Sequence, residues 1–366
     1  MPEEGIPSRG TPLRFAPFRP LPLSPASPLI GNTVYTYDKR GNILSAERYA
    51  LKPRPLESVL YSYTGDILSS CTTDQQTVSF SHDALGRMTS DGLAGTTIAY
   101  NHLDKPRIIS KNHVNSGNYS YLADGTLVDV EDGLGLGLVY RGSLIYKKLP
   151  SSLGSLEFES AGFEGGRVTP GGVKYHLTDH LGSVVMVLDG MSGTVDEANR
   201  YGEYGARTQL EGTSATAGRY HFSGKEDQDK TLGFPYTDFG ARHLSTALRR
   251  WLVQDPLSEK YYGISPYTYC DGDPVNMVDP NGESIRVSPE YQQAFMDALT
   301  AVFDKYADCF SFDEDGYLTY SQGDKKQLSR EASSVLKGLL TVISQQTVTN
   351  VYFTTNITLP SGTHSR

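Results

Sequence analysis

Two Asp-Pro steps are the residues of this chain best placed to do chemistry together. Asp255-Pro256 and Asp279-Pro280 lie 24 positions apart in a segment rich in Tyr, Pro and Gly. If folding brings the two carboxyl groups face to face, they cannot both ionise easily, so one holds a proton while the other activates water. Alternatively, each aspartate caps a turn before a proline of fixed φ. The pattern allows either an aspartyl acid–base pair or two structural turns.

The histidines suggest a metal pair at first sight, because His176 and His180 are spaced as H-x-x-x-H. That spacing suits two ligands on a helix. Glycine and β-branched neighbours favour a strand instead, where the two positions are ~13 Å apart. We therefore expect core histidines and predict neither a metal nor a cofactor.

The elements that must position these residues begin with a repeat. Aromatic anchors, each followed by a polar turn and an apolar pair, recur every 18 to 26 residues at Tyr37, Tyr63, His82, Tyr100 and Tyr121. A period near 20 residues indicates stacked hairpins. Asp38 or Asp83 can form an Asx turn, and a following Gly can take positive φ. Asp104 stands where the pattern calls for that Gly.

Composition also indicates an all-β body. The 366 residues include 37 Gly, 20 Pro and 24 Tyr, and only 20% are charged. Glycine supplies tight turns and tyrosine suits the half-buried surface of a sheet.

The charge pattern disfavours two classes of partner. A net charge of -9 without a Lys/Arg run gives no footprint for nucleic acid or for an anionic membrane surface. Apolar runs are too short for a transmembrane span, and the N-terminus lacks the pattern of a signal peptide. Three scattered cysteines indicate neither a disulfide framework nor a zinc knuckle.

Residues 31 to 282 resemble Rhs (rearrangement hotspot) proteins. The anchor repeat is similar to the YD repeat, with Tyr-Asp kept literally at Tyr37-Asp38. The later part resembles the Rhs repeat-associated core domain, including its Asp-Pro-x-Gly ending. Its matching positions are Gly240, Arg242, Arg250, Trp251, Leu252, Asp255-Pro256, Ser265-Pro266-Tyr267, Tyr269, Pro274-Val275-Asn276, Asp279-Pro280 and Gly282.

The resemblance implies a mainly β fold, in which a strip of stacked antiparallel hairpins curves into part of a β-cocoon closed by a core plug. We expect a Pro-rich lead-in over 1–30, degenerate YD repeats over 31–138, the Rhs core domain over 139–282 and a variable α+β tail over 283–366. Five recognisable repeats are few for a closed shell, so the chain is expected to be part of a longer protein or of a two-chain assembly.

Self-cleavage is the activity that the resemblance implies. In relatives that carry toxins, the aspartates of the two Asp-Pro steps cut the chain just after the Asp-Pro-x-Gly motif, with an arginine assisting. The matching residues are Asp255, Asp279 and Arg242, with Arg250 as the alternative arginine and cleavage near Glu283. Those relatives usually have Leu where this chain has Glu283, and a charged side chain enters an apolar pocket only at a desolvation cost. Self-cleavage and turn capping therefore both remain open.

The tail after Gly282 has a different pattern. Ser288-Pro289-Glu290 supplies helix-start signals, and an apolar stripe predicts a helix over roughly 289–307. A hairpin around 313–316, a second helix near 329–344 and a strand at about 348–359 are also expected. The acidic run 313–316 lacks both anchors of an EF-hand loop. The tail ends without an obvious finish, and we expect it to be truncated.

Two functions compete. The first is a β-shell that encloses or presents a C-terminal polymorphic effector, a toxin-like domain, released by aspartyl self-cleavage. The second is a cell-surface adhesion or recognition scaffold that is never cut. The expected partners are the chain's own tail or a second shell chain, together with a target-cell or immunity protein. The resemblance places the protein outside the cell or on a bacterial surface.

Overall fold

The computed structural model describes residues 33–49, 55–111, 115–149, 155–210, 218–229, 232–260 and 263–284, and parts of 286–320. The lead-in over 1–30, the second helix near 329–344 and the strand at about 348–359 lie outside the described residues. Eighteen strands of the described part form one sheet. They are β1 (Thr33–Tyr37), β2 (Ile43–Tyr49), β3 (Pro55–Thr64), β4 (Ile67–Thr73), β5 (Thr77–His82), β6 (Met88–Asp91), β7 (Thr96–Tyr100), β8 (Pro106–Lys111), β9 (Asn115–Tyr121), β10 (Leu127–Asp132), β11 (Gly137–Arg141), β12 (Leu144–Lys148), β13 (Leu156–Phe163), β14 (Gly166–Thr169), β15 (Gly172–Thr178), β16 (Val184–Asp189), β17 (Val195–Tyr201) and β18 (Arg207–Gln209).

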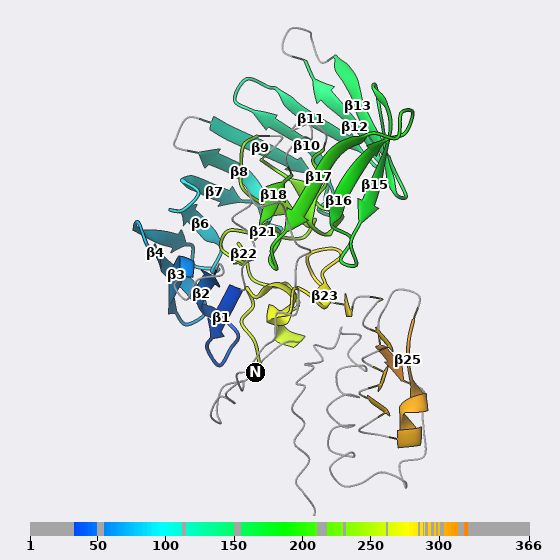
Figure 1. Ribbon diagram of the computed structural model, residues 1–366. Coiled ribbons are helices and arrows are strands. Elements are labelled where there is room, and N and C mark those ends of the chain that lie inside the picture. Colours follow the sequence, from blue (N-terminus) through cyan, green and yellow to red (C-terminus); the bar gives the residue numbers. More distant parts are fainter. Residues whose placement is uncertain are drawn as a thin grey trace, which may run out of the picture.

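Each strand of this sheet pairs antiparallel with the strand before it in the sequence. The expected mainly β fold of hairpins stacked in sequence order is therefore confirmed. The pairing continues without interruption across residue 139, where the core domain was expected to begin. Figure 1 shows the sheet arching from β1 over β11 to β17, with later segments on its concave side.

The curvature has a recurring cause at the aromatic anchors. The strand register shifts at Tyr37, Tyr63, His82 and Tyr100. A β-bulge bends its strand and increases the local twist. Because the bulge recurs at the same place in each repeat, the bends add up and the sheet curls.

The turns after the anchors are built alike. In the turn after His82, Oδ1 of Asp83 accepts hydrogen bonds from the backbone N–H groups of Leu85 and Arg87, both at 3.0 Å. Gly86 has φ +75° in this turn, and Asp104 takes the equivalent conformation with φ +57°. Asp104 therefore occupies a left-handed position that favours glycine.

The anchor tyrosines also join one repeat to the one before it. The hydroxyl of Tyr63 donates to the carbonyl of Ile43 at 2.8 Å, and the hydroxyl of Tyr100 donates to the carbonyl of Met88 at 2.7 Å. Tyr121 makes the same contact with Pro106 at 2.9 Å. These bonds fix the register between successive hairpins.

An inner segment, residues 218–284, lies within the arch of the sheet (Figure 1). Its elements are η1 (Phe222–Gly224), β19 (Glu226–Asp227), β20 (Thr237–Asp238), β21 (His243–Ser245), β22 (Arg250–Trp251), η2 (Ser258–Lys260), η3 (Tyr269–Gly272) and β23 (Met277–Val278). Strands β19 to β22 form a second antiparallel sheet.

The inner segment and the large sheet share one hydrophobic core. Ile109 and Leu68 of the sheet are fully buried, in the same cluster as Phe234, Leu244 and Trp251 of the inner segment. The hydroxyl of Tyr236 donates to Asp91 at 3.1 Å across this interface. Burial of apolar surface on both sides holds the inner segment inside the sheet.

The tail begins with β24 (Arg286–Val287), which pairs antiparallel with β23. The helix expected over 289–307 is helical at its described residues from 289 to 300, but Asp304–Cys309 form the 3-10 helix η4 instead. The expected hairpin around 313–316 is present, because β25 (Phe310–Phe312) pairs with β26 (Leu318–Tyr320). Within the described part of the chain, no helix combines the length and hydropathy that crossing a membrane requires.

Candidate functional site

The structure brings Asp255, Asp279 and Arg242 together in the inner segment. Nη2 of Arg242 lies 2.9 Å from Oδ2 of Asp255 and 3.2 Å from Oδ2 of Asp279. The side chains of Arg242 and Asp279 are 1% and 0% exposed, and that of Asp255 is 9% exposed. The two carboxyl groups are therefore neighbours across a single guanidinium nitrogen, and only Asp255 keeps a small exposed fraction.

Local turns hold both aspartates in place. Oδ1 of Asp279 accepts hydrogen bonds from the backbone N–H groups of Asn281 at 3.2 Å and Gly282 at 2.7 Å. Oδ1 of Asp255 accepts one from Leu257 at 2.7 Å. The turn-capping role expected of each aspartate is thus present in the same residues that meet at Arg242.

Arg242 also contacts the expected point of cleavage. Its Nε donates a hydrogen bond to the carbonyl oxygen of Gly282, the residue before Glu283. Its guanidinium stacks on Trp251, with the carbon 4.2 Å from the ring centroid, and Trp251 itself is buried in the core. One arginine thus links both carboxyl groups to the peptide bond that follows Gly282.

The surroundings of Asp255 and Asp279 favour a proton that stays on one of the two carboxyl groups. Burial raises the pKa of Asp255 and of Asp279 above the ordinary 3.8, although Arg242 acts in the opposite direction on both. Desolvation penalises two carboxylates more than one guanidinium can offset. The pair can therefore hold one carboxylic acid and one carboxylate, and the proton belongs to the pair and to neither aspartate alone.

Gly282 has a conformation that the site requires. Its φ is +80°, and a Cβ on this residue would lie 2.9 Å from the backbone nitrogen of Arg242 and 3.2 Å from Cβ of Phe239. The absence of a side chain lets the chain pass close to Arg242.

Glu283 does not enter an apolar pocket. Oε2 of Glu283 accepts a hydrogen bond from Nδ2 of Asn281 at 3.3 Å, on an exposed part of the turn. The junction itself lies in the loop between β23 and β24, whose paired residues are Met277 with Val287 and Val278 with Arg286. The tail therefore remains hydrogen-bonded to the inner segment on the far side of the junction.

Other sequence candidates lie elsewhere. Nη2 of Arg250, the alternative arginine, donates to the carbonyl of Asp66 at 2.8 Å, and the guanidinium lies over the rings of Tyr63 and Tyr267. His176 is on β15, and Nε2 of His180 lies 2.8 Å from the carbonyl oxygen of Val275. Both histidines are half-buried, so the expectation that they lie in the core was wrong. Among the described residues, no group of three or more His, Cys, Asp or Glu side chains could hold a metal ion.

Sequence reasoning did not mark Lys225 as part of this site. Its Nζ donates to the carbonyl oxygen of Pro280 at 2.5 Å, and burial lowers its pKa although the nearby Asp279 acts to raise it. No motif or spacing in the sequence connects Lys225 to Asp279. Only the folding of η1 against the Asp279 turn brings the two together.

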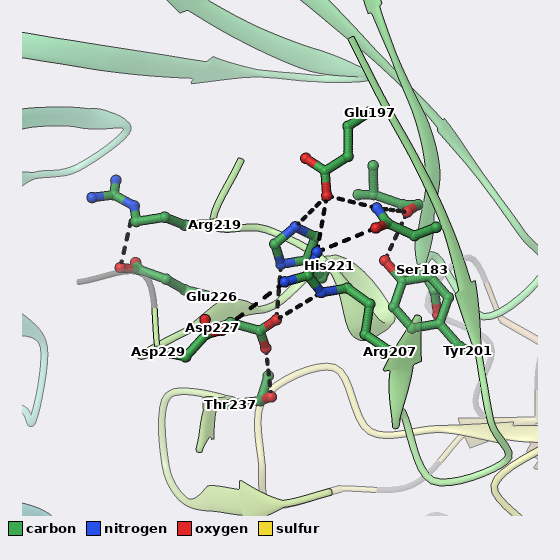
Figure 2. Close-up of polar contacts among 12 residues, drawn as sticks. Ser183, Glu197, Tyr201, Arg207, Arg219, His221, Glu226, Asp227, Asp229 and Thr237 are labelled. Carbon is green, nitrogen blue, oxygen red and sulfur yellow. Dashed lines mark hydrogen bonds and ion pairs between the residues drawn. The ribbon is translucent and has the colours of Figure 1, made fainter. Parts of the chain in front are cut away.

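A second buried polar cluster was also missed, and Figure 2 shows it where β17 meets the inner segment. His221 lies between two carboxylates, with Nε2 2.9 Å from Glu197 and Nδ1 2.8 Å from Asp227. Nη1 of Arg207 reaches the same Glu197 oxygen at 3.1 Å. Burial alone would lower the pKa of His221, but its hydrogen bonds to Asp227 and Glu197 outweigh burial and raise it. A protonated ring donates through both nitrogens, as this geometry requires.

Comparison with known proteins gives a likeness of fold. No family model and no curated protein matches the chain. Among solved structures, the crystal structure of TcdB2-TccC3-Cdc42 is similar with a TM-score of 0.48 and 18% identity, covering 69% of this chain and 16% of that chain. The crystal structure of TcdB2-TccC3-TEV is similar with a TM-score of 0.46 and 17% identity, covering 68% and 15%. This chain thus spans about one sixth of those chains, and identity at this level concerns the fold alone.

Proposed function

We propose that this chain is an Rhs-type β-shell scaffold that separates its own C-terminal tail by aspartyl self-cleavage between Gly282 and Glu283. The observation that carries the proposal is the contact of one buried arginine with Asp255, with Asp279 and with the carbonyl of Gly282. The tail after the cut is proposed to be a toxin-like effector domain that the shell encloses or presents.

The chemistry follows from the shared proton. The ionised carboxyl group takes a proton from a water molecule, and the water oxygen attacks the carbonyl carbon of Gly282. Arg242 stabilises the negative charge that develops on the Gly282 oxygen. The protonated carboxyl group gives its proton to the nitrogen of Glu283 as the C–N bond breaks. The products are a carboxylic acid at Gly282 and an amino group at Glu283, and the two aspartates have exchanged their protonation states.

The shell role rests on the arrangement of the chain. The sheet curls around the inner segment, and the junction falls where that segment ends and the tail begins (Figure 1). A cut at this point leaves the shared core of the sheet and the inner segment intact. Separation of the tail is therefore compatible with a stable shell.

The test is incubation of the purified full chain, followed by denaturing electrophoresis and mass measurement of the fragments. We expect fragments 1–282 and 283–366 from the parent and an intact chain from Asp279→Asn. Denaturing conditions are needed because β23 and β24 pair across the junction. Asp132→Asn is the matched control, since Oδ1 of Asp132 caps a turn through the N–H groups of Leu134 and Leu136 away from the site.

The second candidate function is an uncut adhesion or recognition scaffold. The capping bonds of Asp255 and Asp279 favour it, because they give both aspartates a structural role without any reaction. A parent chain that stays intact on incubation would support this function and contradict self-cleavage, as would an Asp279→Asn variant that is cut like the parent.

A further inference from the structure

A cavity of about 340 Å³ lies between the first and last strands of the large sheet. Its walls include Tyr35 of β1 and Arg48 of β2 on one side, and Arg200 and Tyr201 of β17 on the other. Tyr204 and Arg249 also line it. The volume is in the range of small-molecule sites, and the mixture of aromatic walls with a few polar groups is typical of such sites.

Two arginines that line this cavity, Arg48 and Arg200, each have a buried side-chain N–H group without an acceptor in the described structure. Nη1 of Arg200 and Nε of Arg48 are among the few buried side-chain polar atoms of the described residues that make no hydrogen bond. Buried N–H groups are normally satisfied, and each exception calls for an acceptor such as an ion or a ligand. The guanidinium groups of two arginines with unsatisfied N–H groups therefore line one cavity, and an anion bound there would supply acceptor oxygens.

The acidic residues around the cavity already have donors. Glu57 pairs with Nη2 of Arg48 at 2.9 Å, and Glu203 accepts a hydrogen bond from Tyr35 at 3.1 Å. Asp179 accepts from the backbone N–H groups of Leu181 and Ser183 at 2.9 and 2.8 Å. None of these carboxylates forms an ion pair with Arg200 in the described structure.

The other arginines on the cavity are also occupied. Arg207 forms ion pairs with Glu197 and Asp227, and Nη1 of Arg249 donates to the hydroxyl of Tyr61 at 2.6 Å. Arg200 is different, because Nη1 has no hydrogen-bond partner and no ion pair joins Arg200 to a described carboxylate, and burial lowers its pKa. The guanidinium nonetheless stays charged at neutral pH, so the cavity holds a cation without a counter-ion among the described residues.

We infer that this cavity binds a small organic anion, with a phosphate or carboxylate group held by the guanidinium groups of Arg200 and Arg48 and a planar apolar body between Tyr35 and Tyr201. A guanidinium presents its donors in a fork that matches the oxygens of either anion. The aromatic rings supply apolar area for the body of the ligand. The site does not depend on self-cleavage.

Phenyl phosphate is the probe that tests this site, measured by isothermal titration calorimetry with the full chain. We expect binding in the micromolar to millimolar range that weakens as salt is added. Phenol and inorganic phosphate are measured as controls, since phenol has only the ring of phenyl phosphate and inorganic phosphate has only its anion. We expect inorganic phosphate to bind at least about tenfold more weakly than phenyl phosphate, because it buries no ring, and phenol to show no binding. Saturating inorganic phosphate should compete with phenyl phosphate.

The matched variants are Arg200→Gln and Arg141→Gln. Arg141 is an exposed arginine outside the cavity whose Nη1 contacts its neighbouring carbonyl at Tyr140. Arg200→Gln should weaken phenyl phosphate at least about tenfold, whereas Arg141→Gln should bind like the parent. Thermal unfolding checks that both variants fold, and if Arg200→Gln does not, Arg200→Lys should show a smaller loss of affinity. The inference would be overturned if phenyl phosphate did not bind. It would also be overturned if Arg200→Gln bound phenyl phosphate like the parent, or if inorganic phosphate bound as tightly as phenyl phosphate.

Discussion

Nε2 of His221 lies 2.9 Å from Oε1 of Glu197, and this contact joins the inner segment to β17 deep inside the protein. With Asp227 on its other nitrogen, the ring is held between two carboxylates and beside the guanidinium of Arg207. The groups facing it from the large sheet also include His176, whose positive form would oppose that of His221. The protonation of one histidine therefore contributes to the attachment of the inner segment.

The first prediction concerns the pH dependence of this attachment. The folded pKa of His221 is raised above the ordinary 6.5, so its stabilising contribution is complete below about 6.5 and is lost as pH rises through the folded pKa. We expect the advantage of the parent over His221→Gln in urea unfolding to shrink between pH 6 and pH 9. A constant difference across this range would show that His221 does not titrate in the folded protein.

Arg242 should be essential for stability at neutral pH. Arg242→Met keeps an apolar stem on Trp251 but leaves Asp255 and Asp279 buried without their cation, which should cost roughly 3–5 kcal/mol in the free energy of unfolding. The pKa of both aspartates would rise further, so the folded variant would bind more protons than the unfolded chain. The loss should therefore be smaller at pH 5 than at pH 8. A loss equal at both pH values would contradict an electrostatic cause.

Gly282 should tolerate alanine poorly. Both Gly282→Ala and Gly65→Ala place a side chain at positive φ, which costs about 1–2 kcal/mol. A Cβ at Gly65 meets nothing within 4 Å, whereas one at Gly282 meets the backbone of Arg242 at 2.9 Å. Denaturant unfolding should show a clearly larger loss for Gly282→Ala, and equal losses would mean that the close approach costs nothing.

The tyrosines that join successive hairpins should each contribute through the hydroxyl. Tyr100→Phe leaves the carbonyl of Met88 without its donor and should lower the free energy of unfolding by about 1–3 kcal/mol. Tyr146→Phe is the control, because the described contact of Tyr146 is between its ring and that of Phe158. A change within about 0.5 kcal/mol is expected for the control, and a similar change for Tyr100→Phe would argue against the role of the hydroxyl.

Glu283 should slow the proposed self-cleavage. Self-cleaving Rhs proteins, which this sequence resembles, usually carry leucine at this place, and we expect Glu283→Leu to yield fragment 1–282 faster than the parent. Glu283→Gln tests whether the charge of Glu283 alone slows the reaction, because it removes the charge and keeps a polar side chain of similar shape. The rate is read from the time course of the fragment on denaturing gels, and a slower Glu283→Leu variant would contradict the expectation.

The sequence contained enough to predict the local units of this fold. Aromatic anchors and Asp turns recur along the chain, so Asp83 caps its turn and Asp104 adopts positive φ where glycine was expected. The two Asp-Pro steps and Arg242 were the candidate site residues of the sequence, and the structure places them around one nitrogen. Their catalytic role remains a prediction.

Contacts that depend on the curl of the whole sheet could not be predicted in this way. The hydroxyl of Tyr35 meets Glu203 across 168 positions, which requires the bends of all the intervening hairpins to add up. The contact between His221 and Glu197 depends in turn on where the inner segment enters that curve. Neither pair has a local spacing or a motif that would identify it.

The short ladder between β23 and β24 has a consequence for how the tail would leave the shell. The backbone pairs of Met277 with Val287 and of Val278 with Arg286 stand on opposite sides of the Gly282–Glu283 bond. Hydrolysis of that bond would turn an intramolecular contact into an association between two molecules, whose occupancy depends on concentration and no longer on chain connectivity. Departure of the tail would then be governed by dilution or by a pull along the chain, and the cut and the release would be separate events with separate rates.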